Sequence, residues 1–250
     1  MTVLPASRRA RALATAVVMS LLAMVVPAAA ASADDAAQAR QVGTYAYLVT
    51  PDYDGLLPVA AAARGLTLGL GTFDRLDGEL VLVGGRVYRV GTDGRPVEVT
   101  DDRLTPFFTG VRFRPTASVP VPPGTACADL GRLVTQAAGT ASGMVAVRVR
   151  GTFSDLVARS VPAQAEPYPA LATVVAGQTV FPLAGSRAVL VGFWTGADLA
   201  GVGAPGLHLH GVTADRSAGG HVLSCIAGGD VQLSVEPLDG VTVVTDLPAE

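Results

Sequence analysis

The sequence predicts an α+β fold with largely antiparallel sheet and few helices, and three observations support this. Short apolar runs rich in β-branched residues recur between turn signals, as in "GELVLVGGRVYRVGTDGRPVEV", where Gly84-Gly85 and "GTDG" indicate hairpins. Few segments have helical periodicity. The order strand, helix and then several strands occurs twice, which suggests two similar halves.

The first half contains one predicted strand, a short helix and a group of hairpin strands. "GTYAYLVTPDY" (43–53) alternates enough to predict a strand, and "GLLPVAAAARGL" predicts a short helix that ends near Gly65. Three hairpin strands follow between residues 78 and 99. A proline-rich loop then leads into a helix predicted over residues 128–138.

The second half begins near Gly143. "GMVAVRVRGTF" predicts a strand and "YPALATVVAGQ" a helix. The further predicted strands are "SRAVLVGFW", "GLHLHGVT", "HVLSCIAG" and "GVTVVTDL". We therefore expect one domain over residues 34–250, built from repeat halves of about 44–142 and 143–247.

The first 33 residues have the pattern of a secretory signal peptide. Three arginines precede an apolar run over residues 12–26, and Ala31-Ser32-Ala33 fits a cleavage site, with cleavage after Ala30 as the alternative. The apolar run is too short for a membrane span, and no second run follows. A twin-arginine signal is a weaker alternative. The sequence thus predicts a secreted or cell-envelope protein without a stable membrane span.

Composition limits the classes of function. Without the leader's three arginines, 15 basic residues remain against 21 acidic ones, so the net charge is about −6 and nucleic acid is not an expected partner. All basic residues are arginine, which excludes lysine-based Schiff-base chemistry. Cys127 and Cys225 could form a disulfide in an exported protein or remain two small buried residues. The sequence leaves a homodimer open.

All three histidines of the chain lie within "HLHGVTADRSAGGHV". Residues i and i+2 of a strand share a face, so His208 and His210 should lie side by side, with Leu207 and Leu209 opposite. "TADRSAGG" predicts a turn that brings His221 onto the neighbouring strand. Three neutral imidazoles with an open position are the ligand set of a catalytic zinc site.

The ligand set does not fix the metal, because iron, manganese, nickel or copper could occupy it. Ordinary strand histidines are the non-functional alternative. A cupin is excluded by the lack of an acidic ligand in "GVTAD" after the two histidines.

A glutamate and a pair of arginines are further candidates for the site. Glu79 shares a strand face with Val81 and Val83, where a carboxylate is costly unless it is paired or bound to a metal; otherwise it lies in solvent at a strand end. Arg148 and Arg150 share the opposite face from the valines of "MVAVRVRG". They form either a solvated face or a clamp for a substrate carboxylate.

These motifs together resemble the acetolactate decarboxylase family, from about residue 45 to residue 248. The resemblance rests on "GLGTFDRLDGELV", "AVRVRGTF" and "GLHLHGVTADRSAGGHV", in the same order and with similar spacing. It implies a fold of two β-α-β4-type repeats that form mixed, largely antiparallel sheets around a zinc ion (Zn2+). The implied zinc ligands are His208, His210 and His221.

The resemblance also implies roles for other residues and a reaction. Glu79 matches the family's conserved glutamate, Arg148 its substrate-binding arginine and Thr72 a threonine that lines the site. The implied reaction converts 2-acetolactate, a small molecule, to acetoin and carbon dioxide, with zinc chelating the hydroxyl and keto oxygens and stabilising the enediolate. Relatives have a C-terminal tail with a second active-site glutamate, and Glu250 is the one glutamate near that position here.

Two other functional classes are compatible with the same histidines. Another secreted zinc hydrolase or lyase could use the three-histidine site with zinc-bound hydroxide. A non-enzymatic DNA-binding member of the fold is disfavoured by the leader and the negative charge.

Overall fold

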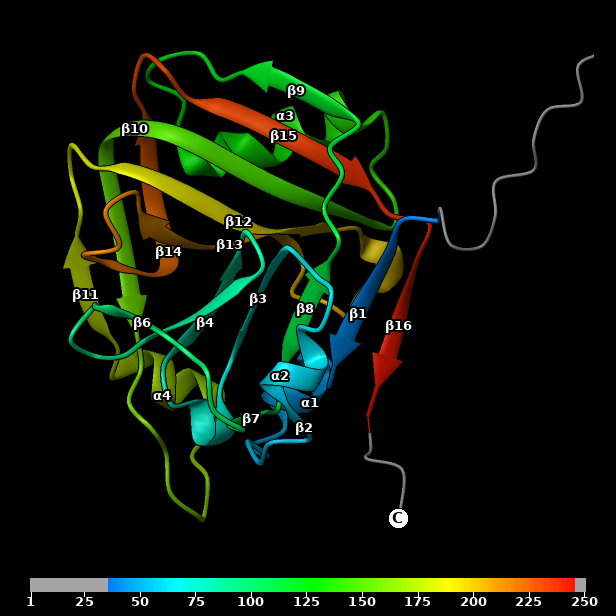
Figure 1. The fold of residues 1–250 in the computed structure, drawn as a ribbon, viewed down its shortest axis with the longest axis vertical. Helices are drawn as coiled ribbons and strands as arrows, with labels where there is room; N and C mark the ends of the chain where they lie inside the picture. Colours follow the sequence, from blue (N-terminus) through cyan, green and yellow to red (C-terminus); the bar gives the residue numbers. More distant parts are fainter. Residues whose placement is uncertain (1–35, 246–250) are drawn as a thin grey trace, which may run out of the picture.

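The computed structural model describes residues 36–245 and contains two seven-stranded sheets that face each other (Figure 1). The predicted signal peptide, residues 1–33, and Glu250 lie outside the described residues. The first sheet has the order β16 (Gly240–Val244), β1 (Gln38–Val42), β8 (Phe108–Val111), β3 (Leu68–Thr72), β4 (Glu79–Val83), β5 (Arg86–Val90) and β6 (Pro96–Glu98).

The second sheet has the order β12 (Arg187–Thr195), β13 (Gly206–Thr213), β14 (Gly219–Ala227), β10 (Met144–Ser160), β15 (Gln232–Pro237) and β9 (Ala117–Pro120). Strand β11 (Thr179–Pro182) also pairs with β10, and β2 (Leu57–Pro58) pairs with β7 (Leu104–Thr105) in a small separate sheet. Among the described strands, β1 and β16 are parallel and the other pairs are antiparallel. The prediction of mixed, largely antiparallel sheet is confirmed.

The helices are short. They are α1 (Tyr45–Val49), α2 (Val59–Ala62), α3 (Cys127–Ala138) and α4 (Leu171–Ala176), with 3-10 turns at Asp74–Leu76 and Ala197–Leu199. The helices predicted at α2, α3 and α4 are confirmed. Among residues 36–245, no helix is long and apolar enough to cross a membrane.

One predicted strand is wrong. The whole segment 43–53 lies outside any strand and includes helix α1, while β1 lies just before it. Thr44 has an extended backbone, and its side chain accepts a hydrogen bond from Tyr47 N at 3.1 Å. This N-cap satisfies a free backbone donor of the first turn, which outweighs the short alternation of apolar residues.

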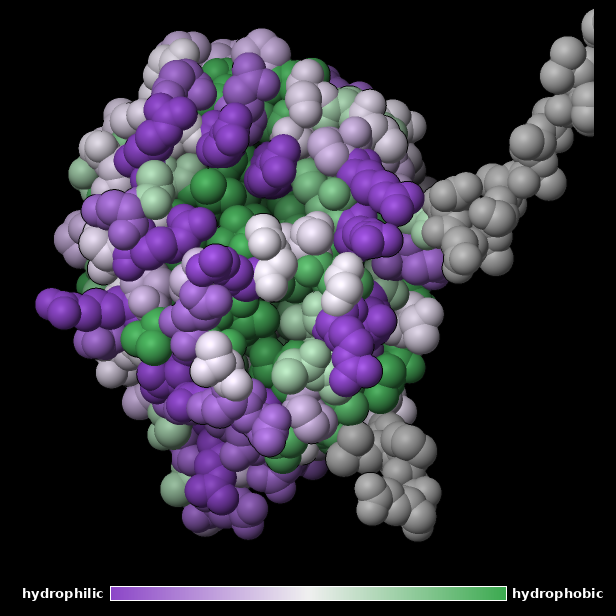
Figure 2. Space-filling model, in the orientation of Figure 1, coloured by the Kyte–Doolittle hydropathy of each residue, from purple (hydrophilic) through white to green (hydrophobic). Residues whose placement is uncertain are grey.

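Hydrophobic residues form three layers around the two sheets. The layer between the sheets includes Leu70, Val81, Val191 and Phe193. A second cluster lies between the second sheet and α3, and a third covers the outer face of the first sheet beneath α2. In the same view, hydrophilic side chains cover much of the surface and hydrophobic ones are visible between them near the centre (Figure 2).

The long strand β10 connects both parts of the second sheet. Residues 144–152 pair with β12, whereas residues 153–159 pair with β14. The change of partner occurs next to Gly151, which has φ +157°, and a Cβ there would lie 2.6 Å from the Cα of Val231. A glycine is therefore required where β10 turns (Figure 1).

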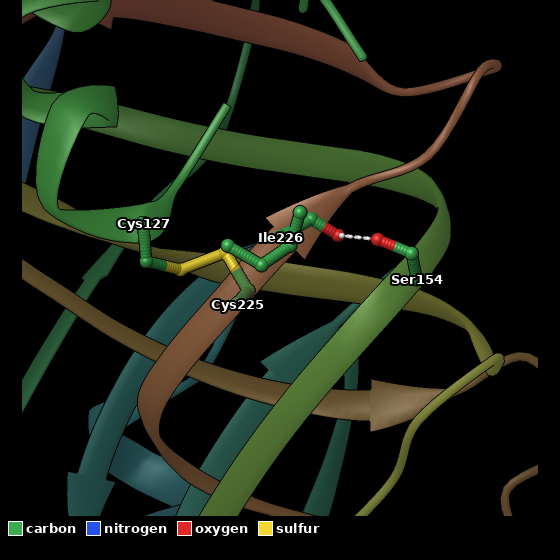
Figure 3. Close-up of a disulfide and its surroundings, with 4 residues drawn as sticks. All are labelled: Cys127, Ser154, Cys225 and Ile226. Carbon is green, nitrogen blue, oxygen red and sulfur yellow. Dashed lines mark hydrogen bonds between the residues drawn. A yellow bond between two sulfur atoms is a disulfide. The ribbon is translucent and has the colours of Figure 1, made fainter. Parts of the chain in front are cut away.

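Both cysteines form a disulfide, which settles the alternative that the sequence left open. Cys127 at the start of α3 is bonded to Cys225 on β14, and the two residues are 98 positions apart in the chain (Figure 3). Close by, Ser154 Oγ donates to Ile226 O at 3.3 Å, joining β10 to β14. The disulfide thus fixes helix α3 to the strand that carries His221.

Candidate metal centre and substrate cavity

The three histidines converge as predicted from their spacing. His208 and His210 lie on β13, and His210 is paired directly with His221 of β14. Nε2 of His208 and Nε2 of His210 each lie 3.2 Å from Nδ1 of His221. Leu207 and Leu209 face the opposite side, in the cluster beneath α3.

The three nitrogens fit one metal ion. One ligand atom of each histidine lies within 4.8 Å of the others. Nitrogens that bind one tetrahedral zinc at about 2.0–2.1 Å lie about 3.3 Å apart, close to the two measured separations. Three imidazole nitrogens cannot all satisfy one another as hydrogen-bond partners, because a neutral ring carries one N–H. A cation bound by all three would satisfy them.

The surroundings prepare the imidazoles for metal binding. Burial lowers the pKa of His208 to about 4, with a further contribution from Arg159. Burial and the neighbouring His208 hold the pKa values of His210 and His221 well below the ordinary range. The rings are therefore neutral at neutral pH, as metal ligands must be.

His210 has a defined tautomer. Its Nδ1 lies 2.9 Å from Leu80 O, and because a carbonyl only accepts, Nδ1 carries the proton. Nε2 is then free to bind a metal, and the backbone of β4 fixes the ring orientation.

Glu79 is buried beside the histidines rather than solvated at a strand end. It is 4% exposed, and its face is shared with Val81 between the two sheets. Its Oε1 accepts from Arg159 Nη1 at 2.5 Å, and its Oε2 lies 3.4 Å from His210 Nε2. Burial raises the pKa of Glu79 to about 7, although the Arg159 charge opposes this rise.

Arg159 is the site residue that the sequence reasoning missed. It lies near the end of β10, directly opposite His221 on β14. Its Nη1 holds Glu79, while its buried Nε has no hydrogen-bond partner among residues 36–245. The predicted strand over residues 143–153 ended before Arg159, whereas β10 turns at Gly151 and continues to Ser160 beside the site.

The structure does not bring Arg148 to the cavity, so this position is a correction. Arg148 pairs with Val191 of β12, and Val191 pairs with His210 of β13. The predicted face is right, but two strand spacings of about 4.8 Å each separate Arg148 from His210. The guanidinium instead lies 5.2 Å from the ring centre of Phe113. Burial, followed by the nearby Arg150, lowers the pKa of Arg148.

One cavity of about 380 Å³ contains the histidines, Glu79, Arg159 and Thr72. Thr72 is paired with Glu79 across β3 and β4, and its hydroxyl donates to Gly78 O at 2.8 Å. Apolar residues form the remaining walls, including Leu48, Leu76 and Phe107, and Leu171 and Val174 of α4. The cavity thus combines a charged end with apolar walls.

The segment before α4 is attached to the first half of the chain by two tyrosines. Tyr53 OH donates to Pro169 O at 2.8 Å, and Tyr168 OH donates to Asp54 Oδ1 at 2.6 Å. The two rings lie 5.0 Å apart. These contacts hold α4 as a wall of the cavity.

The sequence is similar to known proteins over most of its length. The alpha-acetolactate decarboxylase family pattern matches residues 40–250. The alpha-acetolactate decarboxylase of Methanosarcina mazei is 37% identical over 210 residues, covering 84% of this chain and 72% of the relative. That of Methylococcus capsulatus is 34% identical and covers 73% and 70%.

Solved structures show the same fold. The acetolactate decarboxylase structure from Bacillus subtilis subspecies spizizenii has a TM-score of 0.80 at 27% identity, covering 85% of this chain and 91% of that one. The structure from Bacillus subtilis strain 168 matches with the same TM-score and identity. By its sequence over residues 40–250 and its fold, this chain belongs to the alpha-acetolactate decarboxylase family.

Proposed function

We propose that this protein decarboxylates 2-acetolactate to acetoin and carbon dioxide, with a zinc ion held by His208, His210 and His221. The observation that carries the proposal is the cavity in which three neutral imidazoles lie beside the Arg159 guanidinium, whose buried Nε has no partner among residues 36–245. The substrate has matching groups, namely a carboxylate and two adjacent oxygens. A divalent metal at the histidines would supply a Lewis acid for the negative charge that develops as carbon dioxide leaves.

Arg159 is the group that would bind the substrate carboxylate. Its Nη1 is occupied by Glu79, but its buried Nε has no acceptor within the described part of the chain and could donate to the substrate. A planar guanidinium can hold both carboxylates in fixed directions. Arg159 must raise the rate by orienting the breaking bond across the carbonyl plane. Tighter binding of the ground-state carboxylate alone would slow the loss of carbon dioxide.

Glu79 would hold and move the proton. When the bond between the carboxylate carbon and C2 breaks, its electron pair passes into the adjacent carbonyl, and one carbon must then take up a proton. A carboxyl group whose pKa is about 7 can take a proton and return it at neutral pH. Thr72, by donating to Gly78 O, fixes the turn from which Glu79 enters the cavity.

The test is a colour assay for acetoin on purified protein. With 2-acetolactate and zinc, we expect acetoin to form; it should cease after chelation and return when zinc is restored. Activity that persists in metal-free protein would contradict the metal role. Zinc-loaded protein that leaves acetolactate unchanged but hydrolyses another substrate would favour a different zinc enzyme.

We also propose that the chain is exported and that residues 1–33 are removed. The leader composition supports this, and so does the disulfide, because such bonds persist in oxidising compartments. Protein recovered from the medium or cell-envelope fraction should begin near Asp34, as read by N-terminal sequencing. Exported protein that retains Met1 would contradict this proposal.

A further inference from the structure

The loop between β3 and β4 contains two consecutive non-glycine residues with left-handed backbone conformation. Arg75 has φ +60° and Leu76 has φ +58°; among residues 36–245 the one other such residue is Arg216. This conformation is unfavourable for any residue with a Cβ, whereas glycine adopts it freely. The loop therefore has a leucine where a glycine would be less strained.

Hydrogen bonds from separate parts of the chain hold this loop in place. Arg75 N donates to Tyr53 O at 2.8 Å, and Gln164 N donates to Arg75 O at 2.7 Å. Gly78 N donates to Leu76 O at 2.7 Å. Strained residues persist where neighbours fix them in this way, and they concentrate at functional sites.

The side chain of Leu76 lies where the cavity is apolar. Leu76 is 3% exposed, belongs to the cluster between the sheets together with Val161 and Val174, and lines the cavity of the histidines. Two residues further along the loop, Gly78 O accepts a hydrogen bond from the Thr72 hydroxyl, and Thr72 pairs with Glu79 across β3 and β4. Leu76 is thus an apolar wall joined through the loop backbone to the charged end of the cavity.

We propose that Leu76 determines the size of the alkyl group that this cavity accepts; the inference rests on the proposed decarboxylation of 2-acetolactate. A substrate held by its carboxylate at Arg159 and its oxygens at the histidines must direct its alkyl groups at the apolar walls. A glycine at position 76 would relieve the backbone but leave this wall open. The leucine closes it, at the cost of the strain.

The experiment compares Leu76→Ala with the wild-type enzyme on three substrates. These are 2-acetolactate and its two homologues with one additional methylene, at the C2 alkyl group or at the acyl group. One methylene in an apolar site changes kcat/KM by about 10-fold to 200-fold. We expect Leu76→Ala to raise kcat/KM for at least one homologue, relative to acetolactate, by about tenfold. Leu76→Phe should lower the same ratio.

Leu66→Ala is the matched control, because Leu66 is a partly buried leucine on the outer face of the first sheet and does not line the cavity. In Leu66→Ala, kcat/KM for each homologue relative to acetolactate should equal the wild-type value. Ratios for Leu76→Ala within threefold of wild type, or an equal rise in Leu66→Ala, would overturn the role of Leu76. If Leu76→Ala fails to fold, an unchanged ratio in Leu76→Phe overturns it alone. A zinc-loaded wild type that does not decarboxylate acetolactate would instead overturn the proposed function.

Discussion

Arg159→Lys retains the positive charge of this side chain but removes its planar fork. In the structure, Arg159 Nη1 donates to Glu79 Oε1 at 2.5 Å, while Nε is buried and unpaired among the described residues. A lysine ammonium cannot hold Glu79 and a substrate carboxylate with the same fixed geometry. A hydrogen bond to a charged group contributes about 1.5–3 kcal/mol. The value of kcat/KM for acetolactate should therefore fall about 10-fold to 150-fold, at about 1.4 kcal/mol for each factor of ten.

Steady-state acetoin formation measures this loss, and Arg148→Lys is the matched control. Arg148 lies over Phe113 and outside the cavity, so its variant should keep kcat/KM within about threefold of wild type, because it removes no contact with the proposed substrate. Both variants should retain zinc, measured by elemental analysis. A normal kcat/KM for Arg159→Lys together with a large loss of kcat/KM for Arg148→Lys would show that Arg148, and not Arg159, binds the substrate carboxylate. Normal kinetics for both would show that neither arginine binds the carboxylate.

Three further predictions concern the metal, the disulfide and pH. Purified protein should contain about one zinc per chain, and His210→Ala should lose zinc and activity together; a variant that keeps both would contradict the ligand set. Replacing Cys127 and Cys225 by serine should lower the free energy of unfolding in urea by up to about 4.7 kcal/mol, the loop entropy for a separation of 98 residues, and an unchanged value would contradict this. The unfolded chain binds protons at histidine near pH 6.5, whereas burial lowers the pKa of native His208 to about 4, so the stability of metal-free protein should be fully present above about pH 6.5 and decline as pH falls to 4. His208→Gln should show a shallower decline over this window, and equal slopes would contradict the assignment.

The sequence by itself determined the elements whose signals are local. Hairpin strands on either side of Gly84-Gly85 and the helix near residues 128–138 follow from turn residues and periodicity, and both are present as β4, β5 and α3. The histidine site was also predictable, because i and i+2 residues share a strand face and one turn returns the chain beside them. Strand β3 was not predicted, because its sequence alternates glycine with leucine. A Cβ at Gly71 would lie 2.2 Å from Phe107 O, so close approach of β8 determines this residue choice.

Only the tertiary structure decided which charged residues meet the histidines. Alternation correctly placed Arg148 and Arg150 opposite the valines of β10, but it gives a face and no lateral position across a sheet. Arg148 is two strands away from His210, whereas Arg159 arrives opposite His221 because β10 exchanges β12 for β14 beyond Gly151. Glu79 likewise could be a solvated strand end until the second sheet covered it and supplied Arg159 as its partner. The alternation of residues along one strand shows which face each side chain occupies. The distance between residues on different strands follows only from how the whole chain pairs.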